Sequence, residues 1–134
     1  KCVVKEFDFC SSVVAINEGN GKFSIRKLPV RAQLTSVHAI CPLDVNWDGH
    51  EDLVIAGNEF GFLPQFGRLD GGFGDILLGD GQGHFKAIEP YETGFHIKGQ
   101  VRDIAPVDIK RDTNLLFLVN DSVPSLYKIR KRGN

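Results

Sequence analysis

The chain has 134 residues, which is enough for one ordinary domain or for part of a larger one. Its 16 basic and 17 acidic residues give a net charge of −1, so bulk electrostatics do not favour a nucleic-acid partner. No stretch approaches the roughly twenty consecutive apolar residues of a membrane span.

Short apolar runs separated by clusters of glycine, asparagine and aspartate predict an all-β fold. Few segments keep a helical period long enough to predict a helix. Strands that follow one another at short spacing are typical of a sandwich, a barrel or a propeller. The predicted strands span residues 12–16, 22–26, 36–43, 52–56, 75–78, 84–88, 101–109, 115–119 and 125–129.

The three cysteines do not have the spacing of a metal site, and their odd number leaves at least one unpaired. Cys41 lies in an apolar run and is expected to be a small core residue. A disulfide between Cys2 and Cys10 remains open.

The segment 44–52 places oxygen-bearing side chains at a spacing that suits a hard cation such as Ca²⁺. Gly49 would permit the sharp turn that such a loop needs. The alternative is a solvated, metal-free turn between two strands. The oxygen-bearing residues are Asp44, Asn46, Asp48 and Asp52.

Two further residues of this segment have expected roles. His50 stands where a calcium loop offers a backbone carbonyl, and Trp47 is expected to pack against an adjacent sheet. An EF-hand is excluded because its twelfth loop position, normally Glu, is Ile55 within an apolar run.

An internal repeat with a spacing of about sixty residues predicts blade-like units. The second copy has Lys110 where an oxygen ligand would stand and lacks the glycine, so one calcium site is expected rather than two. The paired segments are 17–23 with 79–85, 34–45 with 99–109, and 52–58 with 114–120.

The Asp-x-Asn-x-Asp-Gly-x-x-Asp-Leu loop and the Gly-x-Gly-x-Phe hairpins resemble the FG-GAP/VCBS repeats of integrin α-type β-propellers, most of all their bacterial secreted members. The resemblance covers roughly residues 12–130. It implies four-stranded antiparallel blades around an axis, Ca²⁺ in a loop between strands, and an extracellular or cell-envelope location. The ligands that it implies are Asp44, Asn46, Asp48, the His50 carbonyl and Asp52.

A propeller closes with about four to eight blades, whereas the predicted strands make two to three. The expected fold is therefore a partial β-propeller, with outer strands of an incomplete blade in 1–33, a blade with the calcium loop in 34–97 and a terminal blade in 98–134. The chain could be a C-terminal fragment, which we favour, or it could assemble with copies of itself or form an open stack of sheets. Exposed faces and edges would favour self-association of the isolated segment.

The segment 57–75 is long for a hairpin connection and holds six glycines and three Phe-Gly pairs. Its side chains could form a surface that binds a sugar or a peptide. Alternatively, the phenylalanines pack the loop onto neighbouring blades, which we favour. The candidate ligand-binding residues are Phe60, Phe66, Arg68 and Asp70.

No catalytic motif is present, because the histidines are dispersed and the serines lack a nucleophile-elbow context. The basic segment 128–132 is interpreted as a last strand with a charged tail rather than a nucleic-acid patch. The expected function is adhesion, or binding of an extracellular protein or glycan, without enzymatic activity. The alternatives are a scaffold for a larger polypeptide and, less favoured, a hydrolase or lyase acting on polysaccharide.

Overall fold

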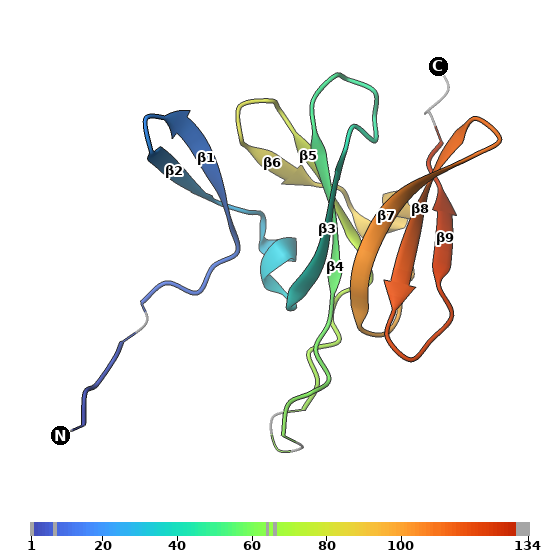
Figure 1. The fold of residues 1–134 in the computed structure, drawn as a ribbon. Helices are drawn as coiled ribbons and strands as arrows, with labels where there is room; N and C mark the ends of the chain where they lie inside the picture. Colours follow the sequence, from blue (N-terminus) through green and yellow to red (C-terminus); the bar gives the residue numbers. More distant parts are fainter. Residues whose placement is uncertain (1, 7, 64, 66, 131–134) are drawn as a thin grey trace.

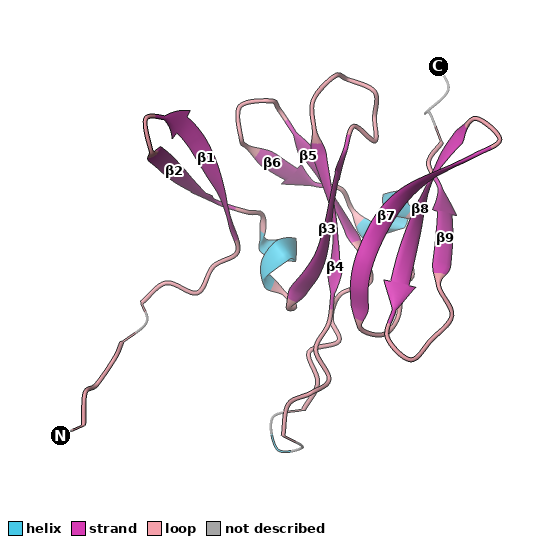
Figure 2. Cartoon of the chain, viewed as in Figure 1, coloured by secondary structure: helices cyan, strands magenta, loops and turns pink. Residues whose placement is uncertain are grey.

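The structure, a computed structural model, describes residues 2–6, 8–63, 65 and 67–130. Three antiparallel sheets lie side by side in chain order, with β1 and β2 at one side of the molecule and β9 at the other (Figure 1). Strands and loops make up nearly all of the described chain, with two short helical turns between them (Figure 2).

The N-terminal sheet consists of β1 (Val13–Gly19) and β2 (Lys22–Lys27). A 3₁₀ turn, η1 (Val30–Gln33), follows it and places Ala32 in the core. Arg31 of η1 forms an ion pair with the buried carboxylate of Asp75, which fixes this turn to the central sheet.

The central sheet has four strands in the order β3-β4-β5-β6. They are β3 (Val37–Leu43), β4 (Asp52–Gly57), β5 (Asp75–Gly79) and β6 (Phe85–Ala87). A single helical turn, α1 (Pro90–Thr93), leads from this sheet towards the next.

The C-terminal sheet has the order β7-β8-β9, with β7 (Val101–Ile109), β8 (Asp112–Val119) and β9 (Ser125–Lys128). Lys110 and Arg111 alone join β7 to β8, and both have positive φ. This is the tight two-residue turn of a hairpin, so the C-terminal sheet has no counterpart of the long loop between β3 and β4.

The internal repeat is present in the backbone register. The β3–β4 pairing shifts by one residue at His38, and the β7–β8 pairing shifts in the same way at Arg102. Four residues after each shift stands a proline, Pro42 in β3 and Pro106 in β7. The two sheets are therefore copies of one unit, related position by position.

The main core lies between the central and C-terminal sheets. Each sheet turns one face inwards, and Phe95, Phe117 and Tyr127 contact one another edge to face there. A second, smaller cluster joins the other face of the central sheet to η1 through Ala32, Ile55 and Leu77. The central sheet is thus covered on both faces, whereas the outer sheets are covered on one.

The all-β fold and its nine strands are confirmed, each within three residues of its predicted bounds. Cys41 is 3 % exposed in the main core, as predicted. Of the expected two to three four-stranded blades, only the central sheet has four strands, whereas the N-terminal and C-terminal sheets have two and three. The two helical turns were not predicted, because each is only four residues long.

Candidate functional site

The predicted calcium loop connects β3 to β4 and leaves the end of the central sheet opposite to the loop 57–75 (Figure 1). Asp44 and Asn46 both direct a side-chain oxygen at one backbone amide, that of Asp48, with N–O distances of 3.1 and 3.0 Å. The second oxygen of Asp44 accepts from Gly49 N at 2.9 Å. These bonds hold the side-chain oxygens of Asp44 and Asn46 in one small volume.

Asp48 completes this group. Its carboxylate accepts from the Asn46 side-chain amide at 2.8 Å and from His50 N at 2.8 Å. The bond from Asn46, followed by the one from His50, lowers the pKa of Asp48. These hydrogen bonds therefore favour the ionised form of this carboxylate.

The turn itself depends on two residues with positive φ, Trp47 at 61° and Gly49 at 88°. Glycine adopts this conformation without steric cost, whereas tryptophan does so with strain. The indole of Trp47 is 44 % exposed and belongs to neither core cluster. That Trp47 packs against an adjacent sheet stays a prediction.

His50 lies against the β5–β6 turn. A Cβ added to Gly81 would come within 2.5 Å of His50 Nδ1, so the imidazole covers that glycine.

Asp52 has a different place from the other predicted ligands. Its side chain is completely buried, and its two oxygens accept from Val45 N and Gly79 N, both at 2.9 Å. Asp52 thus ties the loop and β5 to β4 from inside the protein. The half-buried Asp44 and the exposed Asn46 and Asp48 remain as the candidate cation ligands.

Within the described residues, no group of three or more His, Cys, Asp or Glu side chains is arranged to hold a metal ion. The convergent set has two carboxylates, Asp44 and Asp48, with the amide oxygen of Asn46. All three are hard oxygen donors, which is the ligand chemistry that Ca²⁺ prefers. The set fits a weakly held ion, because Ca²⁺ takes six to eight oxygens and the remaining positions would fall to backbone carbonyls and water.

The loop 57–75 folds back on itself. Glu59 and Leu69 exchange two backbone hydrogen bonds of 2.9 Å, and the guanidinium of Arg68 lies 5.0 Å from the centre of the Phe60 ring. Two of the predicted ligand-binding residues are thus brought together. Asp70 is exposed two positions further on, and Phe66 lies outside the described residues.

A buried polar network fixes the base of this loop, and the sequence analysis missed it. Asn58 is 2 % exposed and has a φ of 82°. Its amide nitrogen donates to Gly72 O at 2.8 Å and Gly99 O at 3.0 Å, while its oxygen accepts from Thr35 Oγ1 and Gly72 N, both at 2.9 Å. Asn58 therefore joins the entry to β3, the loop and the entry to β7.

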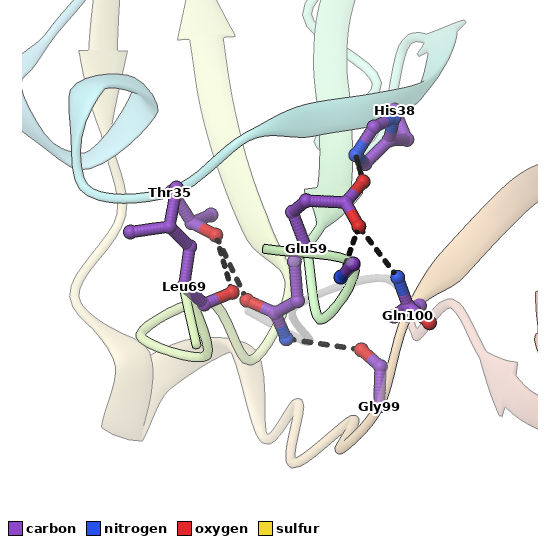
Figure 3. Close-up of polar contacts among 8 residues, drawn as sticks. Thr35, His38, Glu59, Leu69, Gly99 and Gln100 are labelled. Carbon is purple, nitrogen blue, oxygen red and sulfur yellow. Dashed lines mark hydrogen bonds and ion pairs between the residues drawn. The ribbon is translucent and has the colours of Figure 1, made fainter. Parts of the chain in front are cut away.

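The neighbouring Glu59 adds a second link between the central and C-terminal sheets (Figure 3). Its carboxylate accepts from Gln100 Nε2 at 3.1 Å and lies 3.3 Å from His38 Nε2. A hydrogen bond from Gly61 N is the main cause that lowers the pKa of Glu59, with Arg102 and His38 contributing further.

Two histidines pair with carboxylates: His38 with Glu59, and His84 with Asp80 at 2.8 Å. Neither pair borders the open cavity of about 350 Å³ next to η1. A catalytic acid–base pair would need a site that holds a substrate. The cavity is lined by Cys10, Ser12, Gln33, Leu34, Thr35, Ser36, Val37 and Leu69.

No protein-family model matches this chain, and neither the curated proteins nor the solved structures contain a match to it. Among the described residues, no helix is long and apolar enough to cross a membrane.

Proposed function

We propose that this chain is a calcium-binding β-propeller segment of a secreted or cell-surface protein, and that it serves adhesion or the binding of a glycan or protein ligand. The observation that carries the proposal is the convergence of Asp44 and Asn46 oxygens on one amide of a loop that joins two strands of a repeated sheet unit. The stack of three sheets, with the repeat conserved in register between two of them, supports the propeller part.

The proposed ion would bind between Asp44, Asn46 and Asp48. Two carboxylates carry less negative charge than the ligand sets of intracellular calcium buffers and sensors, so we expect a Kd of roughly 10⁻⁴–10⁻³ M, the range of extracellular modules. Such an affinity suits an environment with abundant Ca²⁺. Within the protein, the ion would neutralise the two carboxylates and make the β3–β4 connection rigid.

Isothermal titration calorimetry tests the ion-binding part. The unmodified chain should bind about one Ca²⁺ with the weak affinity given above, and the double variant Asp44→Asn/Asp48→Asn should lose binding. Glu18→Gln, which removes one exposed acidic charge at the β1–β2 turn, is the matched control and should bind as the unmodified chain does. Absence of heat for the unmodified chain at saturating Ca²⁺ would contradict the proposal.

The loop 57–75 is the proposed ligand-binding surface. Its support is the pair formed by the half-buried Phe60 and the exposed Arg68, an aromatic face and a cation held together, with Asp70 as a nearby acceptor. Rings and polar groups presented side by side are suited to sugars and to peptides.

A glycan array with the full-length protein tests this surface. Hits for the unmodified protein that disappear in Phe60→Ala and Arg68→Ala, and persist in the double variant of the calcium loop, would place binding at this surface. Hits that persist in both loop variants would place binding elsewhere on the protein.

A further inference from the structure

The residues on the outward face of the C-terminal sheet correspond, in the internal repeat, to residues that are buried in the central sheet. The pairs Val54–Ile76 in the central sheet and Leu116–Leu126 in the C-terminal sheet occupy corresponding register positions. In the same way, Leu118 corresponds to Ala56. Ala56 pairs with Ala39 and Leu118 pairs with Asp103, and each partner stands one residue after a β-bulge.

The exposure of these corresponding residues differs sharply. Val54, Ala56 and Ile76 are 0 %, 5 % and 9 % exposed, because the C-terminal sheet packs on them. Leu118 and Leu126 are 40 % and 51 % exposed. We call this the C-face: Leu116, Leu118 and Leu126.

The N-terminal sheet also has an exposed apolar face, on the side that points away from the rest of the chain. Phe23 and Ile25 correspond to Phe85 and Ala87 of the central sheet, which pack in the second cluster on the side of the N-terminal sheet. Phe23 and Ile25 are 59 % and 56 % exposed. We call this the N-face: Ala15, Phe23 and Ile25.

The opposite side of the N-terminal sheet is already used. A Cβ added to Gly83 in the β5–β6 turn would lie 2.5 Å from Ile16 Cδ1. Arg26 donates to Gln82 O at 2.6 Å. The N-face therefore points away from the central sheet, and the stack has one unfilled apolar face at each end.

We infer that the C-face of one copy of this chain packs on the N-face of a second copy. Within one chain, the C-terminal sheet already packs on the repeat positions Val54, Ala56 and Ile76 of the central sheet, so the intermolecular contact continues an existing kind of interface. The contact is heterologous, since different surfaces of the two copies meet, and it builds head-to-tail assemblies. It involves neither the calcium loop nor the loop 57–75, so it can fail independently of the proposed function.

Sedimentation velocity over roughly 1–300 µM tests the inference. The unmodified chain should self-associate as its concentration rises. Leu126→Glu and Phe23→Glu should each remain monomeric, because a charge on either face would be buried without a partner. Val123→Glu is the matched control, because Val123 is 79 % exposed in the β8–β9 turn and belongs to neither face; this variant should associate like the unmodified chain.

Mixing the two monomeric variants gives the decisive result. Leu126→Glu retains an intact N-face and Phe23→Glu retains an intact C-face, so an equimolar mixture should form a one-to-one dimer and nothing larger. Far-ultraviolet circular dichroism should be unchanged in both variants, because each replaced side chain is more than half exposed. An unmodified chain that stays monomeric, or a mixture of folded variants that forms no dimer, would overturn the inference.

Discussion

Replacing Asn58 by alanine should be among the most destabilising single changes in this chain. The side chain makes four hydrogen bonds of 2.8–3.0 Å to three separate segments, and two of these hydrogen bonds are buried. At a net value of about 0.5–1.5 kcal/mol each, their loss costs about 2–6 kcal/mol. Alanine at a φ of 82° adds about 1 kcal/mol of backbone strain, so we expect a total of roughly 4 kcal/mol.

Two further variants separate these contributions. Asn58→Gly loses the same hydrogen bonds but accepts the positive φ, so it should be about 1 kcal/mol less destabilised than Asn58→Ala. Asn120 is the corresponding residue of the C-terminal sheet, since Asn120 N donates to Gln100 O at 2.8 Å as Asn58 N does to Ser36 O at 3.0 Å. Within the described part of the chain, its exposed side chain makes one hydrogen bond, to Asp121 at 3.2 Å, so Asn120→Ala should change stability by less than about 0.5 kcal/mol.

Urea denaturation with linear extrapolation is the assay for all three variants. A loss near 4 kcal/mol is a large part of the about 5–15 kcal/mol that stabilises a typical domain, so the midpoint should fall clearly. If Asn58→Ala and Asn120→Ala unfold within about 1 kcal/mol of each other, the network around Asn58 does not hold the sheets together as argued.

Three more outcomes follow from named contacts. Gly57→Ala should destabilise the chain by about 1–3 kcal/mol in a thermal melt, because its Cβ would overlap the Ser36 carbonyl; a gain in stability would refute this. Arg26→Met should speed amide exchange in β1 and β2, since Arg26 bonds to Gln82 O and to His84 Nε2; unchanged exchange there would show that these bonds do not attach the N-terminal sheet. Acid should destabilise the fold, because a hydrogen bond from Gln82 N lowers the pKa of Asp80 to about 2. The contribution of Asp80 to the free energy of unfolding is present above the ordinary pKa near 3.8 and is lost as the pH falls towards 2. In urea melts between these pH values, Asp80→Asn should therefore lose less stability than the unmodified chain; equal losses would contradict the argument.

The sequence predicted the strands well because their signal is local. Each strand is a short apolar run bounded by glycine, asparagine or aspartate, and the repeat fixes the order in which the runs recur. Cys41 was placed in the core for the same reason, since its neighbours in β3 are apolar.

The rest depends on contacts between distant segments, which local patterns do not encode. Asn58 looks like an ordinary turn residue in the sequence, and its importance follows from partners 14, 23 and 41 residues away. Asp52 fits the spacing of a calcium loop equally well whether it points outwards or, as it does, into the protein. The number of strands in each sheet likewise depends on which edges find a partner, and only the structure shows the two-stranded N-terminal sheet.

The most direct test of the central claim is a Ca²⁺ titration followed by ¹H–¹⁵N correlation spectra of the labelled chain. The amides of Asp48, Gly49 and His50 donate to the oxygens that would hold the ion. We expect their resonances to shift and saturate at millimolar Ca²⁺, while those of the equivalent turn at Lys110 and Arg111 stay in place. Spectra that do not change, or shifts spread over exposed carboxylates without saturation, would contradict a calcium site in this loop.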